Sequence, residues 1–248
     1  MRKLYSTEIP CKAGCQYCFA RWSNMYHGLP ALRDNILDEK EAILYPCCDG
    51  EFFDQQELIE YVKKTAEHMD KLYVSISTKR FISDTEISQL ILLNQYLLSA
   101  DKGFVKFGIS ISNISKLDEL EPGTMSYIER MELAKRLNNT PIFTALTLKP
   151  LLPFIDADEY CQIMYDFSQY TKYILIGGLY LELESEFYSK YITSLQPIQH
   201  RVVEWLPERP QWEYVENAEQ ITKIRTYANT HGILLFDSDV DLINHYIR

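Results

Sequence analysis

Short runs rich in β-branched and aromatic residues alternate along this 248-residue chain with longer segments of helical period. The expected strands are Leu4–Ile9, Ala42–Cys47, Leu72–Thr78, Val105–Ser112, Ile142–Leu148 and Tyr173–Leu181. The expected helices are Glu57–Met69, Asp84–Ser99, Ser126–Leu137 and Ala157–Tyr170. Strand and helix in repeated order predict an α/β fold with a parallel sheet and right-handed crossovers. We expect a partial (β/α)6 TIM-like barrel over residues 1–190, with its chemistry at the C-terminal strand ends.

The last part of the chain is expected to be a short extension, residues 191–248, packed on the same domain. Two apolar stretches in it, Val202–Leu206 and Gly232–Phe236, are candidate extra strands that extend or cap the sheet. Between them, two prolines in the run Trp205–Trp212 exclude a regular helix. That run is predicted to be either an ordered lid or a plain surface connection.

The charge of the chain limits the partners that it can attract. The net charge is −10 and the pI is near 5.0, which excludes bulk attraction to nucleic-acid phosphates. Residues 1–36 nevertheless carry five basic against two acidic residues, so an anionic ligand would be expected to meet this opening segment. No uncharged apolar run approaches the roughly 18 residues of a spanning helix, and no secretory signal is visible, so a cytoplasmic protein without membrane contact is expected.

Three of the six cysteines fall within eight residues, as Cys11-Lys-Ala-Gly-Cys15-Gln-Tyr-Cys18. A cysteine cluster in a reducing compartment indicates metal or redox chemistry before disulfides. A structural zinc site closes four ligands, and the nearest further candidate is His27, while a ferredoxin supplies four cysteines to its cluster. Three thiolates that leave one iron open suit chelation of that iron by a small molecule. A zinc loop or a redox-inactive cysteine loop is the alternative.

This Cys-x3-Cys-x2-Cys spacing after the first strand, with Tyr17 before the last cysteine, resembles the signature of the radical S-adenosylmethionine superfamily. The resemblance implies a [4Fe–4S] cluster bound by Cys11, Cys15 and Cys18, with S-adenosylmethionine on the open iron and Tyr17 beside the cofactor. It also implies a reductant such as flavodoxin or ferredoxin, whose electron cleaves the sulfonium to give a 5′-deoxyadenosyl radical. The cofactor would carry the difficult chemistry, and the protein would place a substrate against the radical carbon.

Several segments between Ile9 and Pro153 resemble one branch, the spore photoproduct lyases and their DNA-repair-photolyase-like relatives. They are Cys18-Phe-Ala-Arg21, Glu121-Pro-Gly-Thr124 with Arg130 downstream, and Lys149-Pro150-Leu-Leu-Pro153. Physically, Pro122 and Gly123 set a turn, and Glu121 can pair with Arg130 across the opening of the next helix. We interpret that pair as a structural brace.

The same resemblance implies cofactor contacts at the strand ends. Gly50 and Glu51 match a segment that contacts the amino group of S-adenosylmethionine, where an acidic acceptor suits an ammonium. Lys79 matches a lysine that approaches the cofactor carboxylate, and Ser110 matches a serine that contacts the cofactor. A solvated lysine and an inert strand serine are the alternatives.

Cys48 stands three residues before Glu51, where spore photoproduct lyases have a cysteine that returns a hydrogen atom to the product radical. The resemblance therefore implies Cys48 as the catalytic hydrogen donor. The alternative is that Cys47 and Cys48 are small apolar core residues, since free cysteine is commonly buried. Adjacent strand residues point to opposite faces, so only one of the two can face inward.

The sequence is compatible with three hypotheses about function. The first is radical chemistry on a nucleic-acid or nucleotide component, which the branch likeness and the basic opening segment favour. The second is the same chemistry on a peptide or small metabolite, which the acidic charge and the lack of matching DNA-binding elements beyond residue 155 favour. The third is a non-enzymatic zinc or iron–sulfur binding module.

Overall fold

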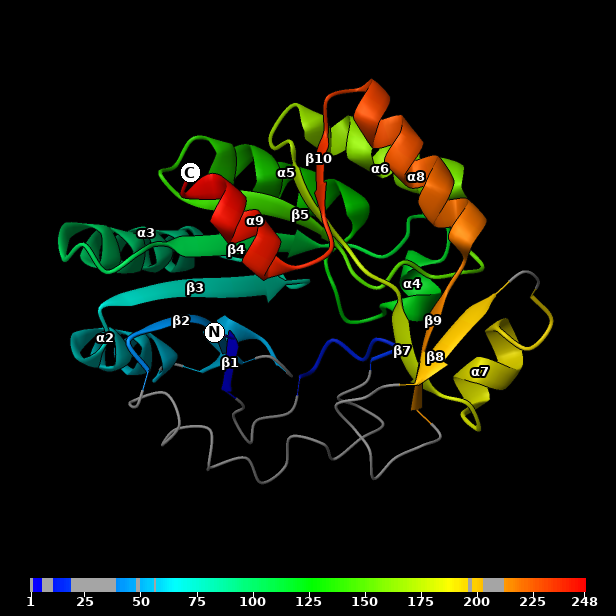
Figure 1. Cartoon of the computed structure of the whole chain (residues 1–248), viewed down its shortest axis with the longest axis horizontal. Helices are drawn as coiled ribbons and strands as arrows, with labels where there is room; N and C mark the ends of the chain where they lie inside the picture. Colours follow the sequence, from blue (N-terminus) through cyan, green and yellow to red (C-terminus); the bar gives the residue numbers. More distant parts are fainter. Residues whose placement is uncertain are drawn as a thin grey trace.

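The computed structural model describes residues 2–5, 11–18, 39–47, 50–55, 57–195, 198–202 and 212–248. Seven parallel strands of this part form one curled sheet in the order β1-β2-β3-β4-β5-β6-β10 (Figure 1). Their bounds are β1 (Arg2–Tyr5), β2 (Glu41–Pro46), β3 (Lys71–Thr78), β4 (Val105–Ser110), β5 (Phe143–Leu148), β6 (Tyr173–Ile176) and β10 (Leu234–Phe236). The α/β fold and the partial barrel predicted from the alternation of strands and helices are confirmed.

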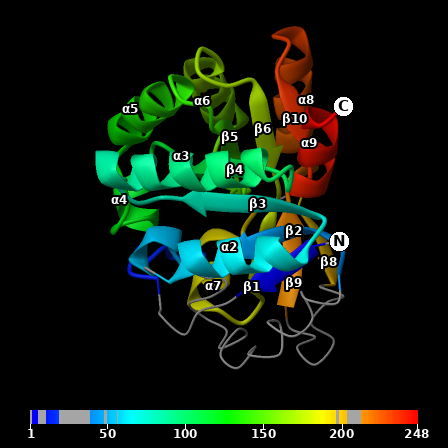
Figure 2. The same cartoon turned by 90° about the vertical axis from the view of Figure 1, so that its left-hand side faces the viewer.

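Helices connect the strands and follow the curve of the sheet from α2 to α6 (Figure 2). They are α2 (Leu58–His68), α3 (Asp84–Ser99), the short α4 (Leu117–Leu120), α5 (Tyr127–Asn138) and α6 (Ala157–Ser168). Ser83 begins α3 and Ser126 begins α5, each with a reciprocal hydrogen bond to the glutamate three residues later. These capping boxes satisfy N–H groups at the helix starts, so the sequence itself sets where both helices begin.

The two faces of the sheet differ in chemistry. On β4, Val105, Phe107 and Ile109 join the main apolar core, whereas Lys106 and Gly108 face the inner side of the curl. The helix α9 (Asp239–Tyr246) covers the inner face near the start of the strands, where its Leu242 and Ile243 share an apolar cluster with residues of β2, β3, β5 and β6. The period of two along each strand therefore separates a dry outer face from a partly polar inner face.

One predicted strand is wrong. Tyr173–Leu181 does not run through as a single strand, because β6 ends at Ile176 and β7 (Leu179–Glu182) joins a second, antiparallel sheet in the order β7-β9-β8. Gly177 and Gly178 separate the two, and Gly178 N–H donates to the hydroxyl of Tyr214 at 2.6 Å. A Cβ at Gly178 would lie 2.6 Å from the Tyr214 ring, so the close approach that redirects the chain requires glycine.

The small sheet contains β8 (Gln199–Val202) and β9 (Trp212–Glu216) and lies with α7 (Glu186–Tyr191) at the end to which β3 and β4 point (Figure 1). The candidate strand Val202–Leu206 overlaps it only at Val202, and its other residues lie outside the described part. Of the proline-containing run 205–212, the structure describes Trp212 alone. The lid or connection expected there stays a prediction.

The second candidate strand, Gly232–Phe236, is confirmed as β10, which pairs in parallel with β6 after α8 (Ala218–Thr230). Residues 234–236 thus belong to the same sheet as residues before 190, and the domain boundary at residue 190 stays a prediction. In the described residues, every helix is too short or too polar to cross a membrane.

Candidate active site

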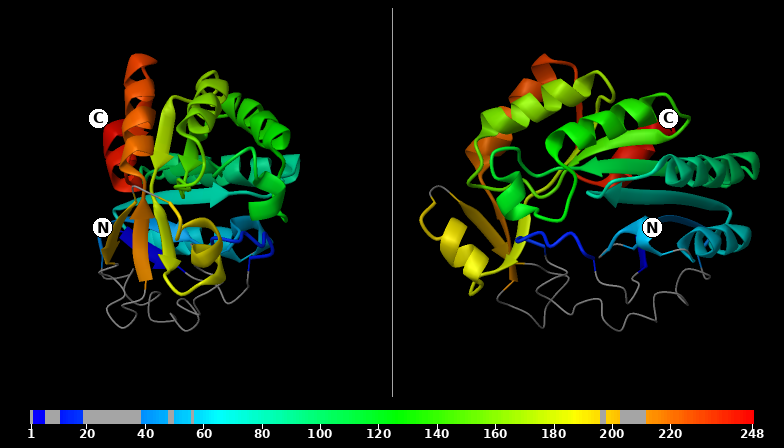
Figure 3. Two further views of the ribbon diagram at one scale, coloured as in Figure 1. Left: turned by 90° about the vertical axis from the view of Figure 1, so that its right-hand side faces the viewer. Right: turned by 180° about the vertical axis from the view of Figure 1, so that it is seen from behind.

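The predicted site residues that the structure describes gather at the C-terminal edge of the parallel sheet. The cysteine loop, residues 11–18, comes after β1, Gly50 and Glu51 come after β2, Lys79 follows β3 directly, and Ser110 ends β4. Seen from behind, this loop runs between the small sheet and the first strands (Figure 3). Parallel strands bring their carboxyl ends together, so residues far apart in sequence meet at this edge.

The cysteine loop is attached to the chain segment before α5. Gln16 N–H donates to the carbonyl of Leu120 at 2.8 Å, and Gly123 N–H donates to the carbonyl of Ala13 at 2.9 Å. A Cβ at Gly123 would lie 2.7 Å from that same carbonyl oxygen, so only glycine permits this approach. The Glu-Pro-Gly-Thr motif singled out in the sequence is therefore the segment on which the loop rests.

The thiols of this loop are free and partly enclosed. Cys15 is 7% exposed, Cys11 and Cys18 are half-buried, and none of the three is in a disulfide. Burial, with the nearby Glu51 and Cys18, raises the pKa of the Cys11 thiol to about 11 although Ala13 N–H donates to its sulfur. A free thiolate at Cys11 is therefore disfavoured, and bound iron is what would hold it ionised.

The three thiols of the loop fit an iron–sulfur cluster. Within the described residues, no three His, Cys, Asp or Glu side chains converge closely enough to hold one metal ion. A closed tetrahedral zinc site would require such convergence, whereas an iron–sulfur cube binds each thiolate through a different iron atom. Three free thiols on one loop could each bind one iron of such a cube, and His27, the other candidate ligand, lies outside the described residues.

Glu121 is the centre of a buried polar network behind the loop. Its Oε1 accepts from Ser112 Oγ at 2.5 Å, from Lys79 Nζ at 2.8 Å and from the Tyr17 hydroxyl, and its Oε2 accepts from Arg130 Nη2 at 2.6 Å. Burial opposes its ionisation, but the charges of Lys79 and Arg130 outweigh burial and lower the pKa of Glu121 to about 2. We call these five residues the edge cluster.

Arg130 ties this cluster to the sheet and confirms the predicted pairing with Glu121. The guanidinium is fully buried, and it also donates to the backbone carbonyl of Ser110 at 2.8 Å and to that of Met125 at 3.0 Å. It therefore links the start of α5 to the end of β4. The sequence did not predict that Glu121 accepts hydrogen bonds from Tyr17 and Lys79, because only the tertiary fold brings the three residues together.

Glu51 has a different environment from Glu121. It is 7% exposed, and it accepts from Thr78 Oγ1 at 2.6 Å and from the backbone N–H of Lys79 at 3.1 Å. Burial raises its pKa in spite of these hydrogen bonds, and it forms no ion pair with any described residue. A buried carboxylate with donors but no cation suits a positively charged ligand group such as an ammonium.

Of the two adjacent cysteines after β2, the structure describes only the first. Cys47 is buried in the main core, and Gln55 Nε2 donates to its sulfur at 3.1 Å, which is typical of a structural thiol. Cys48 lies outside the described residues, so its role as hydrogen donor stays a prediction. Cys161, on α6, is also buried and free.

The inner face of the sheet holds a second buried ion pair that sequence reasoning missed. Lys106 Nζ lies 2.9 Å from Asp239 Oδ1, and Ser75 Oγ donates to the same oxygen at 2.8 Å. Lys149 lies close by and donates from Nζ to the carbonyl of Asp237 at 3.0 Å. We call Lys106, Asp239, Ser75 and Lys149 the inner-face cluster. The sequence feature that could have predicted this ion pair is a lysine within the otherwise apolar strand Val105–Ser110.

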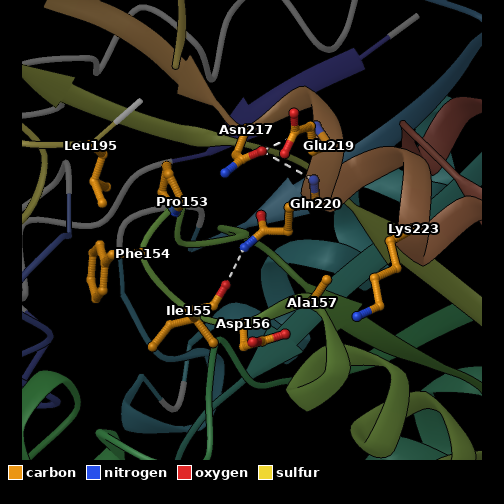
Figure 4. Close-up of a pocket in the computed structure, with 10 residues that line it drawn as sticks. All are labelled: Pro153, Phe154, Ile155, Asp156, Ala157, Leu195, Asn217, Glu219, Gln220 and Lys223. Carbon is orange, nitrogen blue, oxygen red and sulfur yellow. Dashed lines mark hydrogen bonds between the residues drawn. The ribbon is translucent and has the colours of Figure 1, made fainter. Parts of the chain in front are cut away.

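A hollow of about 410 Å³ lies between the segment after β5 and the start of α8 (Figure 4). Its lining is Pro153, Phe154, Ile155, Asp156, Ala157, Leu195, Asn217, Glu219, Gln220 and Lys223. Gln220 Nε2 donates to the carbonyls of Leu152 and Ile155, while its Oε1 is buried without a partner in the described part of the chain. Phe154 contacts Phe187, with ring centroids 6.0 Å apart, and Phe187 contacts Tyr17 at 6.3 Å, so aromatic rings connect the hollow with the cysteine loop.

Comparison with solved structures finds the same architecture in spore photoproduct lyase and in SuiB. Spore photoproduct lyase with bound dinucleoside spore photoproduct superposes with a TM-score of 0.62 at 14% identity, over 91% of this chain and 73% of that chain. The chain has the fold of spore photoproduct lyase. A further structure of that enzyme, with AdoMet and the dinucleoside spore photoproduct, gives a TM-score of 0.56 at 14% identity over 87% of this chain and 70% of that chain.

Streptococcus suis SuiB bound to S-adenosylmethionine is also similar, with a TM-score of 0.53 at 11% identity over 94% of this chain and 45% of that chain. No family model and no curated protein matches the sequence. At these identities the likeness establishes the fold. The roles of individual residues rest on the geometry of the site.

Proposed function

We propose that this chain is a radical S-adenosylmethionine enzyme of the spore photoproduct lyase-like branch. The observation that carries the proposal is the cysteine loop: three free thiols after β1 at the C-terminal edge of a half-barrel, resting on the Glu-Pro-Gly-Thr segment. The shared fold with spore photoproduct lyase and with SuiB, both solved with S-adenosylmethionine bound, supports it.

Cys11, Cys15 and Cys18 would hold a [4Fe–4S] cluster. When bound, that cluster and S-adenosylmethionine supply a 5′-deoxyadenosyl radical that abstracts hydrogen from a substrate. An external reductant such as flavodoxin or ferredoxin supplies the electron. Free cysteines match a reducing compartment, so the cytoplasm is the proposed location.

The residues at the edge bind and orient the cofactor. Glu51 accepts the methionine ammonium, because this buried carboxylate is held by Thr78 Oγ1 and Lys79 N–H but has no described cationic partner. Gly50 lets the cofactor approach the backbone, and Ser110 contacts it from the end of β4. Lys79 is held by Glu121 and the Tyr17 hydroxyl, and its remaining N–H would be available to the cofactor carboxylate.

The edge cluster holds Lys79 and Tyr17 in fixed positions. Each oxygen of Glu121 has donors from different elements, so neither Lys79 nor Tyr17 can move without breaking a buried hydrogen bond. Cys48, three residues before Glu51, is the proposed donor that returns a hydrogen atom to the product radical.

A nucleotide or nucleic-acid component is the proposed substrate. The inner face of the barrel carries Lys106 and Lys149 against Asp239, an excess of positive charge inside a protein of net charge −10. The dinucleoside bound by spore photoproduct lyase of the same fold supports this substrate class.

A peptide or small metabolite is the second candidate substrate, and the hollow beside Phe154 favours it. Asp156 and Glu219 line that hollow, and the unpaired acceptor of Gln220 suits a ligand with N–H groups. The radical chemistry would be the same, and only the substrate would differ.

The test is product formation by the anaerobically reconstituted protein. With dithionite and S-adenosylmethionine, the wild type is expected to release 5′-deoxyadenosine, and Cys15→Ala is expected to release none. Cys161→Ala, which removes another buried free cysteine, is the matched control and should match the wild type. No product from the wild type, or equal loss in both variants, contradicts the proposal.

A further inference from the structure

Three polar side chains from neighbouring strands converge over one glycine on the inner face of the sheet. A Cβ built at Gly108 would lie 2.5 Å from Ser77 Oγ, 2.6 Å from Thr147 Oγ1 and 3.0 Å from Lys106 Nζ. Any side chain at this position would displace these groups, so the convergence depends on glycine. We call Ser77, Gly108, Thr147 and Lys106 the Gly108 niche.

The niche has hydrogen-bonding capacity that the protein itself leaves unused. Thr147 is 6% exposed, and within the described part of the chain its Oγ1 has no hydrogen-bond partner. Lys106 is fully buried, and its ion pair with Asp239 at 2.9 Å accounts for at most one of its three N–H groups. Buried polar groups without partners are destabilising and uncommon, so an unpaired hydroxyl beside an ammonium with unused N–H groups provides capacity to bind a ligand.

The niche meets solvent at Ser77, whereas Lys106 Nζ and Thr147 Oγ1 are buried. Ser77 is exposed although β3 lies between β2 and β4 in the middle of the sheet. Its side chain therefore meets an open part of the inner face. The apolar cluster around α9 covers the same face from Tyr73 and Phe143 as far as Ala145 and Leu175, the cross-strand partners of Gly108 and Thr147.

The charge around the niche selects an anion. Lys106 and Lys149 face the carboxylate of Asp239, whose side chain is 14% exposed, while the nearby carboxylate of Asp237 is paired with Arg225 at 2.6 Å. The stem of Lys149 packs over Gly177, 3.1 Å from a Cβ built there, which directs the lysine along the inner face. Hydroxyl and ammonium donors around a net positive charge match the oxygens of a phosphate group.

We propose that the Gly108 niche binds a phosphate of the substrate, so that the substrate class is a nucleoside phosphate. This inference rests on the proposed function and deepens it, because it places the anionic end of the substrate below the cofactor edge. Ser77 and Thr147 donate to phosphate oxygens, and Lys106 supplies charge while Asp239 keeps its ammonium in place.

The experiment compares thymidine 5′-monophosphate with thymidine as probes of the reconstituted enzyme with S-adenosylmethionine, by isothermal titration calorimetry. The monophosphate is expected to bind roughly tenfold or more tightly than the nucleoside, the effect of a charge-assisted hydrogen bond. Lys106→Met/Asp239→Asn, which removes both charges together, should abolish this preference. Thr147→Val, which changes no charge and little volume, should reduce it.

The matched control is Lys71→Met/Asp101→Asn, because this exposed lysine–aspartate pair has the same 2.9 Å separation far from the niche. It should keep the wild-type preference. Equal binding of the two probes, or a preference that survives in both niche variants, overturns the assignment. Binding of an acidic tripeptide without binding of the monophosphate would also overturn it. Release of 5′-deoxyadenosine by the wild type is scored separately, so a failed niche is distinguishable from a failed radical enzyme.

Discussion

The edge cluster and the inner-face cluster are both built around a buried ion pair, but they differ in how completely their groups are used. In the edge cluster, Glu121 accepts from four side chains, and Arg130 donates to two backbone carbonyls besides. In the inner-face cluster, the ion pair of Lys106 with Asp239 leaves N–H groups of Lys106 without a partner among the described residues, and the neighbouring hydroxyl of Thr147 also has none there.

This difference in hydrogen-bond saturation distinguishes a cluster that stabilises the fold from a cluster that binds a ligand. The Glu121–Arg130 pair within the edge cluster is saturated, so it fixes one geometry and has no capacity left for a ligand. An unsaturated one is costly until something binds, so it marks a place that a substrate completes. Glu121 and Arg130 therefore position the cysteine loop, whereas Lys106 and Thr147 are available to bind a ligand.

The largest effect is expected from breaking the saturated network. Arg130→Met leaves Glu121 buried without its guanidinium, which should lower the free energy of unfolding by about 3–5 kcal/mol. Urea unfolding at pH 7 measures this. Lys135→Met on the same helix removes an exposed lysine 3.6 Å from Glu132 and should change stability by less than about 0.5 kcal/mol. Similar small losses in both variants would show that the edge cluster does not brace the fold.

The inner-face pair should respond differently to single and double substitution. Lys106→Met alone removes the ion-pair partner of Asp239 and should cost about 3 kcal/mol of unfolding free energy. Lys106→Met/Asp239→Asn should restore most of that stability, because the introduced amide would keep an acceptor for Ser75 without a charge. Urea unfolding of both variants tests this, and an additive loss in the double variant would contradict it.

Acid should weaken the edge cluster more than the inner-face cluster. The pKa of Glu121 falls from near 4.5 to about 2, and that of Asp239 falls from near 3.8 to about 2. A lowered pKa in the folded state stabilises the fold above the unfolded value, and this contribution is lost as the pH falls toward 2. Glu121→Gln should therefore flatten the decline of stability between about pH 5 and pH 2 more than Asp239→Asn does. Thermal unfolding across that range measures the slopes, and identical slopes would be inconsistent with this difference.

The smallest effect is expected at the unpaired hydroxyl. Thr147→Val removes a buried group without a described partner, so stability should stay within about 0.5 kcal/mol of the wild type or rise. Tyr160→Phe is the matched contrast, because its hydroxyl donates to the Ser112 carbonyl at 2.8 Å and accepts from Leu152 N–H at 2.7 Å. That variant should lose about 1–2 kcal/mol in urea unfolding. A larger loss for Thr147→Val than for Tyr160→Phe would show that Thr147 is already satisfied.

Local pattern was sufficient for most of the sheet and for the cysteine loop. β3 and β5 lie within a residue of their predicted bounds, because a buried parallel strand is a continuous apolar run that the sequence displays directly. The pairing of Glu121 with Arg130 was also predictable, since nine residues across a helix start bring the two together.

What could not be predicted depends on partners far along the chain. The break after Ile176 is set by Tyr214, whose hydroxyl meets Gly178 only once the small sheet has formed. The partner of Lys106 comes from α9 at the other end of the sequence. A glycine or a lysine in a strand can be recognised in the sequence as unusual. The contacts that explain it come from residues far along the chain, so no local pattern predicts them.

The central claim is that the cysteine loop holds a four-iron cluster with one iron open to S-adenosylmethionine. Electron paramagnetic resonance of the reduced, reconstituted protein tests it, with and without S-adenosylmethionine labelled with ¹⁵N at its amino group. The account predicts roughly four iron and four sulfide per chain, a spectrum that shifts on addition of S-adenosylmethionine, and a ¹⁵N coupling to the cluster. A single bound zinc, or a cluster whose spectrum is unchanged by S-adenosylmethionine, would contradict it.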